Sequence, residues 1–302
     1  MTAKIGKTVA ESRPHWPDRP VRPPGADGKG APNILLIMTD DVGFGAPSTF
    51  GGVIPTPTLD RLAARGLRYT NFHTTSLCSP TRAALLTGRN HHAVGMGCLS
   101  NFDSGFPGYR GKIAHDAPLL SELLRPHGYR NYMVGKWHCT PLTQTGPTGP
   151  FDGWPLGRGF DRFYGFLDAE TDQYSPELVR DNTHITAPGD HASGYHLTED
   201  LIDQSTTWMR DLVSVRPDRP FYLYLAFGAQ HAPHHAPDAY LAKWRGKFDE
   251  GWDVHRDRVF ARQKEMGIIP EGTTLAMRNP GVRPWVELTK NEQLFACRLQ
   301  EA

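Results

Sequence analysis

The sequence predicts an α/β protein whose central sheet is mixed, mainly parallel, and sandwiched by helices. One observation is a short apolar run at residues 33–38, NILLIM, bounded by polar residues. Such a run is typical of a parallel strand covered on both faces, so we expect a central strand there. A second observation is that helical patterns alternate with strand patterns further along, as in layered α/β domains. The length of 302 residues suffices for one large core.

Two regions are expected from composition. Residues 1–30 are polar and rich in proline, with too few apolar side chains for a core of their own, and are predicted to form an extended N-terminal arm. Residues 31–302 are predicted to form the domain that carries the function.

Asp40 and Asp41 come directly after the first apolar run. The carboxyl end of a buried strand is where open α/β sheets bind ligands, and two adjacent carboxylates repel each other unless a cation lies between them. The pair therefore favours a metal site over the alternative of a solvated turn. Calcium is preferred because carboxylate oxygens suit a hard cation, and magnesium or manganese would also fit.

Cys78 is predicted to lie at the entrance of a helix. It opens the stretch 78–82, CSPTR, in which Pro80 suits a first helical turn, and Gly88 suits the C-terminal cap. A helix N-terminus and the nearby guanidinium of Arg82 favour an anion at this position. The residues alone leave two readings open, an activated thiolate and a buried, inert cysteine.

Three helix-strand units are expected along the chain. They are a helix at 56–66 with a strand at 67–73, a helix at 117–124 with a strand at 129–134, and a helix at 198–209 with a strand at 221–227. The second unit ends in GKWH, where strand alternation would put Lys136 and His138 on one side. Residues 140–195 are expected to form long structured loops, and a charged helix is expected around 252–266.

Three histidines follow the strand expected at 221–227, namely His231, His234 and His235. Their spacing suggests zinc, but the prolines among them prevent the regular helix that would hold them on one face.

Composition excludes several classes of protein. Lys and Arg number 33 against 32 Asp and Glu, so no global field favours nucleic acid or an anionic membrane, and neither is expected as a partner. No run approaches the roughly 20 apolar residues that span a bilayer, and the N-terminus shows no apolar signal segment, so a cytoplasmic location is expected. Four cysteines without a C-x-x-C pair argue against a disulfide framework and a structural zinc site.

Residues 78–82 match the C-x-P-x-R signature of the type I sulfatases, and residues 83–89, AALLTGR, extend the match. The chain further resembles this family at 55–62, at Asp40 and Asp41, at the GKWH segment and at His231, from residue 33 to its end. The resemblance implies an alkaline phosphatase-like fold and an arylsulfatase-like hydrolase acting on small sulfate esters. It also implies that a formylglycine-generating enzyme oxidises Cys78, and that Asp40, Asp41 and the modified Cys78 bind one divalent metal ion. His234 and His235 match no site residue of the family and are left as structural or surface residues.

The resemblance assigns a role to each remaining residue. Arg82 and the metal orient a hydroxyl of the hydrated formylglycine for attack on sulfur, His231 and Lys136 assist the leaving alcohol, and His138 accepts the proton whose loss expels sulfate.

Two alternatives remain. The first is a phosphonate monoester or phosphodiester hydrolase, which would use the same formylglycine. Alternatively, the chain is a non-catalytic fragment, because the family's later Asp-Asn pair, second active-site Lys and smaller C-terminal domain are not found in it. Asp181 and Asn182 come too early in the family order to replace that pair. A sheet without its later strands would expose an apolar edge, so the isolated chain is expected to be poorly soluble or to associate.

Overall fold

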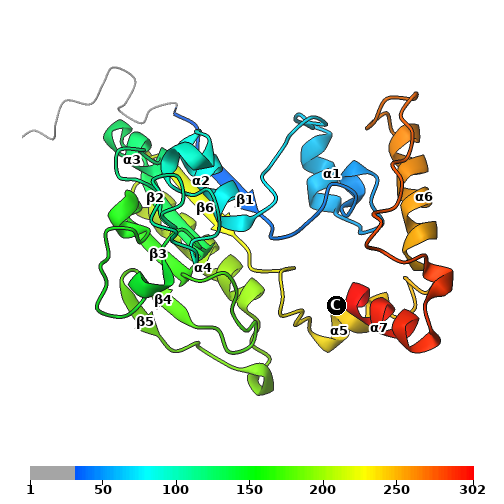
Figure 1. Ribbon diagram of the computed structural model, residues 1–302. Helices are drawn as coiled ribbons and strands as arrows, with labels where there is room; N and C mark the ends of the chain where they lie inside the picture. Colours follow the sequence, from blue (N-terminus) through cyan, green and yellow to red (C-terminus); the bar gives the residue numbers. More distant parts are fainter. Residues whose placement is uncertain (1–30) are drawn as a thin grey trace, which may run out of the picture.

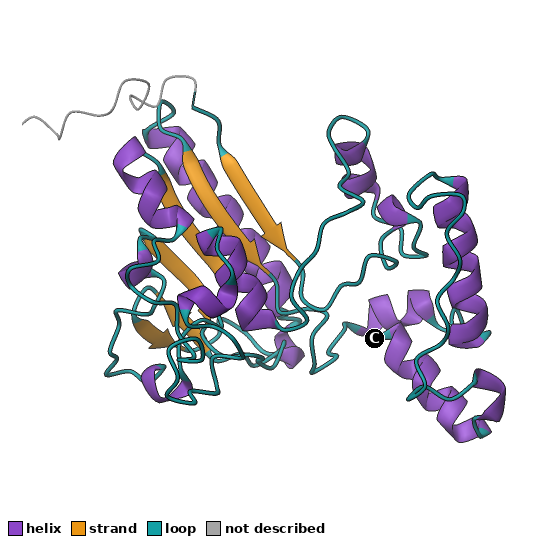
Figure 2. Cartoon of the chain, turned by 45° about the horizontal axis from the view of Figure 1, so that its top comes forward, coloured by secondary structure: helices purple, strands orange, loops and turns teal. Residues whose placement is uncertain are grey.

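The computed structural model describes residues 31–302, and the expected proline-rich arm at 1–30 lies outside the described residues. Its centre is a six-stranded sheet in the order β1-β6-β2-β3-β4-β5 (Figures 1 and 2). The pairs β1/β6, β6/β2 and β2/β3 are parallel, whereas β3/β4 and β4/β5 are antiparallel. The strands are β1 (Ile34–Met38), β2 (Arg130–Lys136), β3 (Arg162–Phe166), β4 (Leu178–Arg180), β5 (Thr183–Ile185) and β6 (Phe221–Ala226). The predicted mixed, mainly parallel sheet is confirmed.

Helices cover both faces of this sheet. On one face, Ala83 and Leu86 of α2 (Cys78–Thr87) pack in a buried cluster with Tyr222 and Tyr224 of β6, beside α3 (Leu120–Leu124). On the other face, α4 (Leu197–Val215) buries Leu201 and Trp208 against the alternate residues of β6. Alternation along a strand explains the division, because successive side chains point to opposite faces.

The expectation that the first strand is central is wrong for the described chain. β1 lies at one end of the sheet and pairs only with β6 among the described strands. The side chains of Leu35 and Ile37 are 49% and 50% exposed. The run is apolar on both faces, as expected, but only one of its faces is covered.

The strand expected at 67–73 does not form, although the helix before it does, as α1 (Pro57–Ala63). Leu67, Tyr69 and Phe72 are instead exposed in a loop. Their alternation fits a strand, but no neighbouring strand offers them a hydrogen-bonded ladder. The opposite error occurs at 140–195, where β3, β4 and β5 form inside a stretch expected to be loops.

The C-terminal part contains α5 (Asp238–Trp244), α6 (Gly251–Glu265) and α7 (Lys290–Glu301), at a distance from the sheet (Figure 1). The charged helix expected around 252–266 is confirmed as α6. It holds the segment after β1, because Gln263 Nε2 donates to the Phe50 carbonyl at 3.0 Å and Arg262 donates to the Gly52 carbonyl at 3.1 Å.

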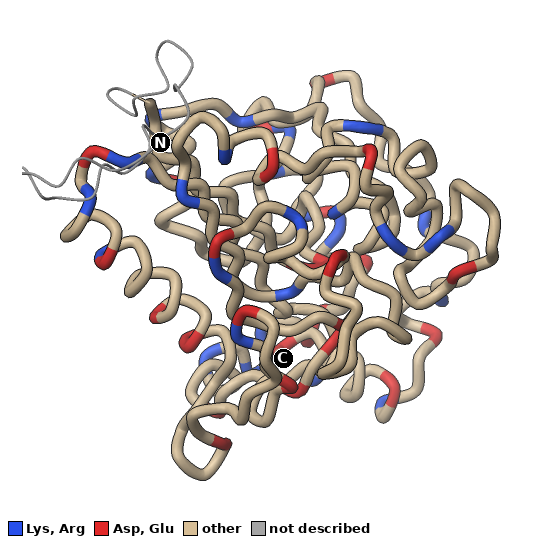
Figure 3. The backbone as a smooth tube through the Cα atoms, turned by 90° about the vertical axis from the view of Figure 1, so that its left-hand side faces the viewer, with Lys and Arg blue, Asp and Glu red and all other residues tan. Residues whose placement is uncertain are grey.

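Basic and acidic residues are interspersed along the backbone rather than gathered by sign (Figure 3). Of the helices in residues 31–302, none has the length and apolar character needed to cross a membrane.

Candidate active site

Three neighbouring parallel strands end at the same edge of the sheet. Met38 of β1 pairs with Ala226 of β6, and Ala226 pairs with Gly135 of β2. The residues that follow these positions are Asp40, Lys136 and the loop that carries His231. Sequence-distant groups are thereby brought to the sheet edge where α/β proteins bind ligands.

Asp40 is the centre of a buried ionic cluster. Its carboxylate is 2.5 Å from Lys136 Nζ and 3.7 Å from Arg82 Nη2. The three side chains are at most 5% exposed. The backbone of Asp40 is fixed as well, donating to the Ala229 carbonyl and accepting from the Gln230 N–H. Two cations against one carboxylate leave an excess positive charge, which favours a bound anion.

Arg82 reaches this cluster from the first turns of α2. Its Nη1 donates to the Lys136 carbonyl at 2.8 Å and to the Tyr224 hydroxyl at 3.2 Å. Burial raises the pKa of Tyr224 to about 12, so this hydroxyl stays neutral. Arg82 Nε and Nη2 have no hydrogen-bond partner within residues 31–302. Buried donors without partners are costly, so these N–H groups suit a ligand that accepts hydrogen bonds.

His138 is fully buried and has a left-handed backbone, with φ of 48°. Strand alternation therefore does not apply to it, although it lies near Lys136 as expected. Nε2 is 3.2 Å from Asn101 Oδ1, and Nδ1 has no partner in the described chain. Burial, then the positive charges of Lys136 and Arg82, lowers the pKa of His138 to about 3. The imidazole is neutral at physiological pH.

His231 lies between two carboxylates. Its Nε2 is 3.9 Å from Asp41 Oδ2, and its Nδ1 is 3.6 Å from Glu170 Oε2. Asp41 also has a left-handed backbone, with φ of 54°, and its carboxylate is 65% exposed. The sequence pattern did not point to Glu170, because it lies in a loop with no motif. This arrangement places the ring within reach of two acidic side chains from different loops.

Cys78 is the first residue of α2, with Pro80 in the first turn and Gly88 as a left-handed C-cap, as predicted. The residue is partly exposed. It lines a cavity of about 1160 Å³ together with Asp40, Asp41 and Arg82. The thiol is therefore open to a ligand that contacts the ionic cluster, and the reading of a buried, inert cysteine is not supported.

The expected metal site can be tested against the side chains present. Asp40 and Asp41 supply carboxylate oxygens, the donors that calcium prefers, and the Asp41 carboxylate is free to bind. Within residues 31–302, no three or more His, Cys, Asp or Glu side chains gather as a complete metal site. The donors fit a calcium-type ion in kind but form only part of its coordination shell.

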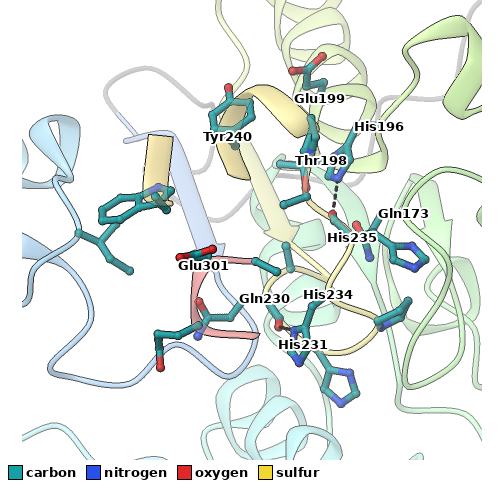
Figure 4. A pocket seen from close by; sticks show the side chains of 18 of the residues that line it. Gln173, His196, Thr198, Glu199, Gln230, His231, His234, His235, Tyr240 and Glu301 are labelled. Atoms are coloured by element: carbon teal, nitrogen blue, oxygen red, sulfur yellow. Dashed lines mark hydrogen bonds between the residues drawn. The ribbon is translucent and has the colours of Figure 1, made fainter. Parts of the chain in front are cut away.

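Another cavity, of about 360 Å³, is lined by His196, His231, His234 and His235 (Figure 4). His196 Nε2 contacts the His235 carbonyl at 2.9 Å, and His234 Nδ1 lies 3.1 Å from the Gln230 carbonyl. The His235 ring stacks on Tyr174. These contacts give His234 and His235 structural roles in the loop after β6, in agreement with the sequence prediction.

Asp181 and Asn182 lie in the turn between β4 and β5, near the end of the sheet opposite β1. Asp181 Oδ1 accepts a hydrogen bond from the Phe163 N–H at 3.0 Å. Asp181 therefore ties this turn to β3. The expectation that the pair does not complete the metal site stays a prediction.

Comparison with known proteins identifies relatives. The sequence profile of the Sulfatase family matches residues 32–300. An uncharacterized sulfatase of Schizosaccharomyces pombe is 36% identical over 297 residues, covering 89% of this chain and 50% of that protein. Human arylsulfatase A is 34% identical over 250 residues, covering 72% of this chain and 45% of that protein.

An arylsulfatase of Klebsiella aerogenes is 29% identical over 285 residues, covering 89% of this chain and 58% of that protein. Among solved structures, the PsFucS1 sulfatase from Pseudoalteromonas has a TM-score of 0.54 at 25% identity, covering 78% of this chain and 51% of that one. The chain thus spans about half the length of these relatives. The family profile matches nearly all of the described residues, and the fold is shared with a solved sulfatase. The chain therefore belongs to the sulfatase family.

Proposed function

We propose that this protein hydrolyses sulfate esters to an alcohol or phenol and inorganic sulfate, in the manner of an arylsulfatase. The observation that carries the proposal is the buried cluster of Asp40, Lys136 and Arg82, which has an excess positive charge and of which Asp40 and Arg82 line the same cavity as Cys78. Family membership supports it, since the relatives include arylsulfatases of Klebsiella aerogenes and human.

Arg82 and Lys136 are the groups that bind the sulfate moiety. The Arg82 N–H groups without partners accommodate nonbridging oxygens, and Lys136 adds charge from the adjacent strand end. Because the cluster is fixed by packing before substrate arrives, little reorganisation is needed as negative charge develops on the ester.

His231 is the proton donor for the leaving oxygen. Asp41 and Glu170 flank its two ring nitrogens, at 3.9 Å and 3.6 Å. Protonation of the departing oxygen matters most for esters of weakly acidic alcohols. His138, held neutral by burial, is the proton acceptor that completes the cycle.

Cys78, once oxidised to formylglycine by a formylglycine-generating enzyme, would supply the nucleophile. Asp40 and Asp41 would hold a divalent cation, with calcium preferred, and such an ion would supply positive charge next to the sulfate group. The fit rests on the exposure of Cys78 to the cavity and on the carboxylate donors beside it. The cytoplasmic location expected from the sequence stays a prediction, as does the absence of nucleic-acid and membrane partners.

The experiment combines modification with turnover. Protein made in its own host is digested, and the peptide containing Cys78 is weighed for replacement of the thiol by an aldehyde. The same sample is assayed with matched aryl sulfates and aryl phosphonate monoesters, with Cys78→Ala as the control. Faster sulfate turnover that Cys78→Ala abolishes supports the proposal. Faster phosphonate turnover would assign the related hydrolase activity instead, and unmodified, inactive protein would overturn it.

A further inference from the structure

Asn101 contacts the active site from a loop that lies between the CSPTR and GKWH motifs and belongs to neither. Its Oδ1 lies 3.2 Å from Nε2 of His138 and 3.3 Å from the Ser100 hydroxyl. Asn101 is an exposed residue, whereas the His138 ring that it contacts is fully buried, so Asn101 reaches the ring from the surface side.

The loop that carries Asn101 is tied to the helix that carries Cys78. The Ser100 N–H donates to the Ser79 hydroxyl oxygen at 3.1 Å, and both serines are at most 1% exposed. On the other side, Gly111 has φ of +64° and packs so closely that a Cβ there would lie 2.6 Å from the Ser100 carbonyl oxygen. Asn101 is therefore held in place from two directions.

This contact determines which nitrogen of His138 carries the proton. A side-chain carbonyl oxygen can only accept a hydrogen bond, so the His138 nitrogen that faces it must donate. In the neutral ring, the proton is then on Nε2, and the lone pair is on Nδ1. Nδ1 is buried and has no partner in the described chain. The ring therefore presents an unpaired acceptor inside the site.

We infer that Asn101 is a positioning residue for His138: its side-chain carbonyl holds the proton on Nε2 and leaves Nδ1 as the acceptor. The tautomer follows from contacts alone, whereas the use of Nδ1 to accept a proton during turnover rests on the proposed function. The charged or titratable groups around the ring are Lys136, Arg82 and His231, and their positive charges oppose a second proton.

The tautomer is measurable without substrate. The protein is labelled with ¹³C- and ¹⁵N-histidine, and the His138 signals are assigned by their loss in His138→Asn. The expected signals are those of the Nε2–H tautomer at neutral pH in the unsubstituted protein. A matched control is Asn71→Ala, which removes another Asn carbonyl, 2.6 Å from His73 Nε2, and should leave the His138 signals unchanged.

Two substitutions complete the test. Asn101→Leu removes the acceptor and should mix the two tautomers while lowering kcat about 10- to 100-fold with little change in KM, the usual effect of losing a residue that orients a catalytic group. Asn101→Asp restores an acceptor and should restore the Nε2–H tautomer. Its carboxylate also favours the imidazolium, so the acidic limb of the kcat profile should move to higher pH.

The outcomes separate the two proposals. An Nδ1–H signal in the unsubstituted protein, or an unchanged tautomer in Asn101→Leu, overturns the role of Asn101. The expected tautomers in a protein that turns over no sulfate ester support the positioning role and count against the proposed function instead.

Discussion

The Lys136 ammonium lies 2.5 Å from the Asp40 carboxylate, and this contact joins the ends of β2 and β1 across the strand β6 that separates them. Neither side chain is more than 5% exposed. Replacing one member of a buried pair leaves the other charge without compensation, which costs about 3–5 kcal/mol. The contact is therefore structural as well as part of the proposed site.

We expect Lys136→Met to lower the free energy of unfolding by about 3 kcal/mol, the lower part of that range, because Arg82 remains near Asp40. The double variant with Asp40→Asn should lose less than the sum of the single variants, by more than about 1 kcal/mol. Urea denaturation of the four proteins measures this coupling. Strictly additive losses would show that the contact contributes nothing specific.

Arg82→Lys should reduce kcat about 100-fold or more, because a lysine cannot supply the unpaired Nε–H and Nη2–H donors. Tyr224→Phe is the matched control, since it removes only the hydroxyl that accepts from Arg82 Nη1. It should cost about 1 kcal/mol, or less than tenfold in kcat. Steady-state kinetics with an aryl sulfate compare the two. Equal losses of kcat in Arg82→Lys and Tyr224→Phe would mean that Arg82 acts through its contact with Tyr224 rather than through donors to the substrate.

His138 should make stability depend on pH. Its pKa of about 3 in the folded protein lies below the ordinary value of 6.5, so the unfolded chain takes up a proton that the folded chain does not. The contribution of neutral His138 to the free energy of unfolding is therefore fully present above pH 6.5 and is lost as the pH falls from 6.5 toward 3. Between pH 7 and pH 5, the loss should be about 2 kcal/mol.

His138→Asn is the control for that measurement, because Asn tolerates the left-handed backbone and does not titrate. Urea unfolding at both pH values should show a smaller decrease in the variant. Parallel stability curves for the two proteins would mean that folding does not lower the pKa of His138.

Gly135→Ala should destabilise the protein by about 3 kcal/mol or more, the upper range for overpacking. Gly135 has φ of +103°, and a Cβ there would lie 1.8 Å from the Ala226 carbonyl oxygen of β6. Gly146→Ala, with nothing within 4 Å of the added carbon, is the comparison and should change stability by less than about 0.5 kcal/mol. Thermal unfolding measures both, and a tolerated Gly135→Ala would contradict the observed spacing of β2 and β6.

The exposed side of β1 should drive association of the 302-residue chain. Leu35 and Ile37 are about half exposed on a strand that pairs along one edge only within residues 31–302. Replacing both with Thr keeps the strand propensity and should reduce association, whereas Val213→Thr, an exposed apolar residue on α4, should not. Sedimentation velocity at several concentrations measures this, and a monomer at all concentrations before substitution would refute the expectation.

The sequence predicted well what local patterns encode. The run before Asp40, the caps of α2 and the buried strand β6 each follow from spacing and residue type, and the structure confirms these elements. It could not reveal that β1 lies at the end of the sheet, because an apolar strand looks alike whether or not a neighbour covers it. The strand wrongly predicted at 67–73 has the same cause, because the sequence of a segment does not show whether a neighbouring strand pairs with it.

The residues of the candidate site also fall into a predictable group and a group that the sequence did not reveal. Residues attached to strand ends or a helix start were predictable because regular elements position them. Asn101, Glu170 and Tyr224 were missed for two reasons. The first two lie in loops without a motif, and Tyr224 is one aromatic residue within an apolar strand. Their roles depend on contacts such as the Asn101–His138 hydrogen bond, which join residues 37 positions apart.

The place of β1 in the sheet has a further consequence, for hydrogen exchange. β6 and β2 are each flanked by strands on both sides, whereas every second amide of β1 points away from its one described neighbour. Those outward amides should exchange with solvent faster than the amides of β6 and β2. Lys136 therefore ends, and His138 follows, a strand expected to exchange slowly, while Asp40 and Asp41 follow the strand expected to exchange faster. Because Asp40 contacts Lys136 directly, local opening of β1 would also change the surroundings of Lys136.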